Sequence, residues 1–139
     1  MNRTTKRILC VFLLCCICLL TFLLFELVVP LESGGVWGTQ FMSEEETAQI
    51  LCKTVNMDMS HLTSYLEYKQ GSLRAFLMKG KDANWCVTFV KSKYFNLFWL
   101  SNVVNIQYYP STFGQRVQDK VCVVEVTGSS ITTYDWKLA

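Results

Sequence analysis

His61 is the only histidine among the 139 residues, so any reaction that needs an imidazole as general acid or base must use it. It follows Ser60 directly and stands three residues after Asp58. A Ser-His-Asp triad depends on where the three side chains lie in space, and closeness in sequence does not supply that geometry. We therefore interpret His61 as a loop or edge histidine without a catalytic role.

Three cysteines, Cys52, Cys86 and Cys122, lie outside the apolar N-terminal segment. They have neither the C-x-x-C spacing of a redox pair nor that of a zinc ribbon, and three cysteines leave one thiol over after one internal disulfide. A zinc site that adds His61 to the three has little support, so we predict no metal and no cofactor. Buried unpaired thiols are the favoured interpretation. Cys52 and Cys122 are both expected to face the core and are the candidate disulfide pair.

Other signatures of catalysis or of nucleic-acid binding are missing from the sequence. There is no glycine-rich phosphate loop and no G-x-S-x-G nucleophile motif. From Pro30 onward the chain has ten basic and ten acidic residues. A neutral domain without a basic stripe does not neutralise phosphates, so we expect no nucleic-acid partner.

One aromatic group could form a binding surface, because aromatic side chains are enriched both at protein interfaces and at membrane boundaries. Aromatic side chains also dominate cores, and the core interpretation of this group is favoured over the binding surface. The candidate binding residues are Tyr94, Phe95, Phe98, Trp99, Tyr108 and Tyr109.

The N-terminal segment has the length and composition of a membrane span. Residues 8–29 form an apolar run of 22 residues, interrupted by Glu26 near its end. As a helix this run measures about 33 Å, enough to cross a hydrocarbon core of about 30 Å. Glu26 is close enough to the outer end to extend its carboxylate to the interface.

The flanking charges predict the orientation of this segment. Arg3, Lys6 and Arg7 all precede the apolar run. The positive-inside rule then places residues 1–7 in the cytoplasm, residues 8–29 in the membrane as a signal anchor, and the remainder outside. The alternative is a cleaved signal peptide. It is disfavoured because the run is longer than a usual hydrophobic region and no A-x-A-like site follows Val29.

Residues 30–42 are predicted to be a linker, and residues 43–139 an extracytoplasmic α+β domain. Ser43 is a natural N-cap for a helix that ends near Asn56, with Ala48, Leu51, Cys52 and Val55 on its buried side. Residues 61–69 fit either helix or strand, and strand is preferred. Further strands are expected over 73–78, 85–90 and 103–109, with loop over 111–118. The backbone of residues 94–100 is left unassigned.

Two segments at the C-terminal end, 120–127 and 131–137, predict a β-hairpin around Gly128-Ser129-Ser130. A two-residue turn would place Val126 beside Ile131 and Cys122 beside Asp135. A three-residue turn would instead place Cys122 beside Trp136. The second register separates apolar from polar side chains better, so we favour it.

These elements predict an α+β fold in which one helix packs on an antiparallel sheet of about five to six strands, behind a transmembrane helix. The expected role is that of a membrane-tethered binding or accessory module that contacts a protein or another envelope component, without enzymatic activity. The alternative is a small extracytoplasmic enzyme that uses His61 or one of the exported cysteines.

Overall fold

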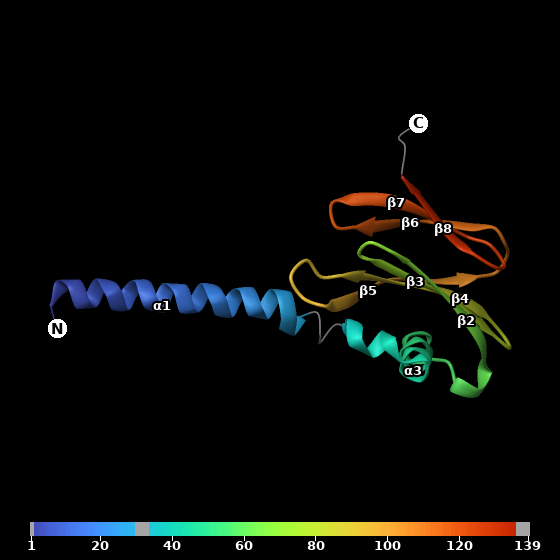
Figure 1. Ribbon diagram of the computed structural model, residues 1–139, viewed down its shortest axis with the longest axis horizontal. Helices are drawn as coiled ribbons and strands as arrows, with labels where there is room; N and C mark the ends of the chain where they lie inside the picture. The colour runs from blue at the N-terminus through green and yellow to red at the C-terminus, as the bar shows by residue number, and fades with distance from the viewer. Residues whose placement is uncertain (1, 30–33, 136–139) are drawn as a thin grey trace.

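The computed structural model describes residues 2–29 and 34–135 of the chain (Figure 1). Helix α1 (Arg3–Leu23) continues into the π-helical turn η1 (Leu24–Val28) and projects away from a domain of helix and strands. Asn2 caps α1, because its side chain accepts a hydrogen bond from the backbone N–H of Thr5 at 2.8 Å. None of the side chains of α1 is buried in the fold.

Two antiparallel sheets make up the β part of the described domain, so the predicted α+β class is confirmed. The larger sheet has the order β1-β5-β4-β3-β2, and the smaller has the order β6-β7-β8. The strands are β1 (Val36–Trp37), β2 (Leu62–Gln70), β3 (Leu73–Gly80), β4 (Asn84–Lys91), β5 (Leu97–Ile106), β6 (Ser111–Val117), β7 (Lys120–Val126) and β8 (Ile131–Asp135).

Helix α3 (Glu44–Val55) forms where the sequence predicts it. The Ser43 side chain accepts a hydrogen bond from the backbone N–H of Glu46 at 3.4 Å, and Asn56 ends the helix in the left-handed conformation with φ of 56°. Leu51 and Cys52 are buried, and Ala48 and Val55 are half-buried. The short 3-10 turn η3 (Met59–His61) leads from this helix into β2. The strand interpretation of residues 61–69 is therefore the right one.

The domain has three layers (Figure 1): α3 lies on one face of the larger sheet, and the smaller sheet lies on the other. Strand β3 explains this arrangement, because alternate side chains point to opposite faces. Phe76 and Met78 face α3, whereas Ala75 and Leu77 face the smaller sheet. One predicted core is therefore two cores, separated by the larger sheet.

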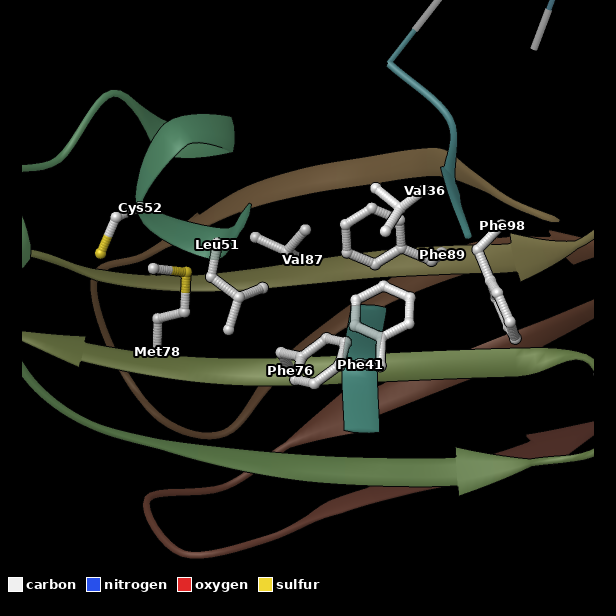
Figure 2. Close-up of a cluster of buried hydrophobic side chains, with 9 residues drawn as sticks. All are labelled: Val36, Phe41, Leu51, Cys52, Phe76, Met78, Val87, Phe89 and Phe98. Carbon is white, nitrogen blue, oxygen red and sulfur yellow. The ribbon is translucent and has the colours of Figure 1, made fainter. Parts of the chain in front are cut away.

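The helix-side core contains the aromatic centre of the domain (Figure 2). The Phe41 ring lies 5.4, 5.2 and 5.5 Å from the rings of Phe76, Phe89 and Phe98. Such pairs contribute about 0.5–1.5 kcal/mol each beyond the burial of their area. The buried members of this core are Val36, Phe41, Leu51, Cys52, Phe76, Met78, Val87, Phe89 and Phe98.

The sheet-side core lies between the two sheets. Its buried members are Leu73, Ala75, Leu77, Cys86, Ile106, Val124, Val126 and Ile131. Strand β4 contributes to both cores, since Val87 and Phe89 face the helix and Cys86 faces the smaller sheet.

Two segments belong to the folded domain against expectation. Residues 36–42, predicted as linker, form β1 and the 3-10 turn η2 (Gly38–Met42), and they place Val36 and Phe41 in the helix-side core. Residues 111–117, predicted as loop, form β6, which pairs along its whole length with β7. Of the separate strand predicted at 103–109, residues 103–106 belong to the longer β5 and residues 107–109 follow it. The pairing of β5 with β4 shifts register between Thr88 and Phe89.

The preferred register of the last hairpin is wrong. Val126 pairs with Ile131, Val124 with Thr133 and Cys122 with Asp135, which is the register of the two-residue turn. The backbone N–H of Thr127 donates to the carbonyl of Ser130 at 2.9 Å and closes that turn. Ile131 is thereby buried and Tyr134 exposed. Trp136, on which the other register was based, lies outside the described residues.

Candidate functional site

The candidate aromatic surface divides into separate parts. Tyr94 and Phe95 precede β5, whereas Tyr108 and Tyr109 follow it. Ten residues of strand span roughly 33 Å, so the two pairs lie at opposite ends of the domain. Each pair therefore belongs to a different surface.

The middle of the aromatic group belongs largely to the core. Phe98 is 5% exposed and packs against Phe41 in the helix-side core, so it is no part of a binding surface. Trp99, next in sequence, points to the opposite face of β5 and is half-buried. At the far end, the Asn84 side-chain amide donates to the Tyr109 hydroxyl at 3.3 Å, and Tyr108 is 73% exposed.

Cys52 and Cys122 do not form the candidate disulfide. All seven cysteines lie in described residues and are free. Cys52 lies in the helix-side core, and Cys122 packs against the sheet-side core. The larger sheet stands between the two thiols, which is the physical reason the prediction fails.

The three thiols of the domain are in surroundings that disfavour the reactive thiolate. Burial raises the pKa of the Cys86 thiol to about 12. Burial also raises the pKa of the Cys52 thiol, with the nearby Asp58 carboxylate adding to it. For Cys122, burial raises the pKa and the Asp135 carboxylate contributes in the same direction. All three therefore stay protonated near neutral pH.

His61 lies at the end of η3, with Nδ1 3.7 Å from a carboxylate oxygen of Asp82. Both side chains are well exposed to water, where such a pair contributes little. The Asp58 carboxylate instead accepts a hydrogen bond from the backbone N–H of Ser60 at 3.1 Å, and this hydrogen bonding lowers the pKa of the Asp58 carboxyl. Across residues 2–29 and 34–135, no three His, Cys, Asp or Glu side chains are placed to hold a metal ion.

Gln115 is a buried polar residue that the sequence pattern did not single out as a candidate. It is fully buried, and its side-chain oxygen accepts from the Thr88 hydroxyl and the Asn102 amide, both at 2.7 Å. Its amide nitrogen donates to the Ser101 hydroxyl at 2.7 Å and to the Arg116 carbonyl at 2.8 Å. These four bonds use the whole capacity of the amide and join β4, β5 and β6. The network is satisfied internally, so we assign it a structural role.

A groove of about 680 Å³ separates the start of α3 from the edge strand β2. Among the described residues β2 pairs with β3 alone, so its other side carries unpaired backbone groups. Met42 is 84% exposed here, and the Tyr65 hydroxyl donates to the Glu44 carbonyl at 3.4 Å across the groove. The lining residues are Phe41, Met42, Glu44, Glu45, Ala48, Leu62, Thr63, Ser64, Tyr65 and Glu67.

Among the residues that the structure describes, three carboxylates and no basic side chain line this helix–edge groove. Glu44 and Glu45 belong to the first turn of α3, where the helix dipole stabilises them. Glu67 lies 3.6 Å from the Arg74 guanidinium, which also packs over the Phe41 and Phe98 rings. The groove thus joins a free strand edge to an acidic rim.

A second groove, of about 560 Å³, lies between the end of the N-terminal helix and the neighbouring ends of β4, β5 and β6. Its lining includes Lys91, Lys93, Trp99 and Arg116 from the domain and Glu26 from η1. The two grooves are opposite in character, one acidic and one mainly basic.

No protein-family model matches this chain, and neither a curated protein nor a solved structure is significantly similar to it.

Proposed function

We propose that this protein is a membrane-tethered module whose domain lies outside the cytoplasm and binds another protein. The observation that carries the tether is the helix Arg3–Val28, whose most apolar stretch of 18 residues has a mean hydropathy of 3.2 and no buried side chain. Its leucine, isoleucine and phenylalanine side chains would face water in a soluble monomer. Each Å² of apolar surface removed from water contributes about 25 cal/mol, which favours insertion into a bilayer.

The basic residues Arg3, Lys6 and Arg7 at the start of this helix support a cytoplasmic N-terminus. The domain after it would then be extracytoplasmic, and the helix would act as a signal anchor. Arg3 and Lys6 are exposed, as the cytoplasmic end of such an anchor requires.

The helix–edge groove is the surface that best suits a protein partner. An extended segment of the partner can add a strand to β2, and main-chain hydrogen bonds then supply affinity. The acidic rim of Glu44, Glu45 and Glu67 favours a segment that carries lysine or arginine. The exposed side chain of Met42 provides an adaptable apolar contact beside it.

The test is site-specific crosslinking in the native host, with a photoreactive amino acid in place of Met42 in the full-length chain. We expect one discrete adduct whose yield falls several-fold when Glu45→Lys is added. Glu46→Lys is the matched control, because it makes the same charge change in the same helical turn but lies outside the groove. It should leave the yield unchanged.

Two outcomes would count against this surface. One is an adduct at Met42 that is insensitive to Glu45→Lys or equally sensitive to Glu46→Lys. The other is the absence of an adduct at Met42 when the same photoreactive residue at Tyr108, on the other exposed end of the domain, gives one.

A further inference from the structure

The loop between β4 and β5, residues 92–96, reaches back to the apolar helix (Figure 1). The Tyr94 ring lies 5.3 Å from the Phe22 ring of α1 in an edge-on arrangement, and the Phe95 ring lies 6.4 Å from it. Tyr94 nevertheless remains 58% exposed. The loop therefore presents an aromatic side chain to whatever surrounds the end of the helix.

The position of Phe22 fixes the level of this loop relative to a bilayer. Phe22 follows Arg7 by 15 residues, which correspond to about 22 Å of helix. The hydrocarbon core is about 30 Å thick, so with Arg7 at the inner boundary Phe22 lies less than about 10 Å inside the outer one. A ring in contact with Phe22 then lies close to the outer interface, where tyrosine and tryptophan are enriched.

The second groove, which is mainly basic, lies beside the same loop. Lys91, Lys93 and Arg116 are exposed, and among residues 2–29 and 34–135 no carboxylate lies within 4.0 Å of their charged groups. The Lys93 ammonium is 5.4 Å from the centre of the Tyr94 ring. Glu26 also lines the groove, so three cations face one carboxylate there. An excess of positive charge at headgroup level is complementary to lipid phosphates.

We propose that this end of the domain is a second membrane contact, in which Tyr94 and Phe95 enter the outer interface and Lys91, Lys93 and Arg116 bind phospholipid phosphates. The proposal rests on the membrane anchoring inferred above. It goes beyond that anchoring because it fixes one face of the domain against the bilayer, where a tether alone would leave the domain free to turn.

The experiment uses the full-length chain in nanodiscs that contain a phospholipid with a photoactivated carbene precursor near the headgroup, and peptide mapping by mass spectrometry. We expect labelling of the 92–96 segment several-fold above that of the loop containing Tyr108. Tyr94→Asp with Phe95→Asp should reduce the labelling of the 92–96 segment to that level. Tyr108→Asp, the matched control at the far end, should leave it unchanged.

A second comparison tests the cations. Labelling of the 92–96 segment should increase when anionic phosphatidylglycerol replaces part of the phosphatidylcholine. The triple variant K91Q, K93Q and R116Q should lose that increase. An increase that persists in the triple variant would overturn the assignment of these side chains to lipid phosphates.

The labelling of α1 separates the two proposals. If α1 is labelled but the 92–96 segment is no more labelled than the Tyr108 loop, the second contact is wrong and the anchor stands. If neither is labelled, the anchor itself fails and the second contact fails with it.

Discussion

Gln115 joins both sheets through a single side chain. Its four hydrogen bonds reach Thr88 on β4, Ser101 and Asn102 on β5, and the carbonyl of Arg116 on its own strand β6. A buried polar group left without its hydrogen-bond partner lowers the free energy of unfolding by about 1–3 kcal/mol. One substitution here therefore leaves several groups unsatisfied at once.

We expect Gln115→Ala to lower the free energy of unfolding by about 2–4 kcal/mol, because it removes the shared partner and leaves a cavity. Urea unfolding of the full-length protein in mild detergent measures this. Gln107→Ala, at an exposed position after β5, should change it by less than about 0.5 kcal/mol. Similar small effects for both would mean that the two sheets are held together without this network.

Cys86 predicts a pH dependence of stability. Its thiol has a pKa of about 12 in the folded domain, against an ordinary value of 9.0. Below pH 9 both states keep the proton and the thiol has no effect on the pH dependence. Between 9.0 and about 12 the unfolded chain loses the proton and the folded one retains it, so the free energy of unfolding falls. The slope approaches about 1.4 kcal/mol per pH unit.

Cys86→Ala should remove this part of the slope, although it lowers stability at every pH through the cavity it leaves. The measurement is urea unfolding of the two full-length proteins at about pH 8 and about pH 10, where tyrosine and lysine ionisation is common to both. Parallel pH dependence in the two proteins would show that burial does not hold the Cys86 proton.

Element by element, the sequence predicts best where the signal is local. Ser43 and Asn56 mark the ends of α3 through capping and left-handed backbone preferences, and both residues do so in the structure. The alternation in β4 is equally local. Strand β6 has no such pattern, since Gly114 and Gln115 interrupt it and its stability comes from pairing with β7. Its side-chain partners lie on strands remote in sequence, so sequence pattern alone misses both strand and network.

The candidate sites follow the same rule. Phe98 and Tyr94 are both aromatic and only four residues apart, yet one is core and the other surface, because β5 begins between them. The register of the last hairpin depends on which apolar residue is covered. In the structure Ile131 is buried in the second core, between the two sheets. The sequence predicted a single core and did not indicate this second one.

Turn η2 gives a matched test of where the domain begins. Phe41 is 6% exposed and contacts three other phenylalanine rings, whereas the adjacent Met42 is 84% exposed. We expect Phe41→Ala to cost about 3–5 kcal/mol and Met42→Ala less than about 0.5 kcal/mol. Thermal or urea unfolding of the full-length chain distinguishes them. If both are tolerated, residues 36–42 are the linker that their composition predicts.

At the scale of the whole molecule, the helix and the three-layer domain make a topology that can be tested directly. With the proposed orientation, protease added to spheroplasts should degrade the domain and spare a tag fused to the N-terminus. Protection of the domain would reverse the orientation. A mature protein that begins near Ser33 would instead identify a cleaved signal peptide.

The short connection between helix and sheet limits how far the domain can travel. Eight residue steps separate Val28, the last residue of η1, from Val36 at the start of β1. Fully extended, they span at most about 28 Å, less than the thickness of a bilayer. With the proposed anchor and the proposed partner, the encounter would be a search in two dimensions at a high effective concentration. On this proposal, the helix–edge groove would need only a modest intrinsic affinity, provided the partner's segment also lies near the membrane.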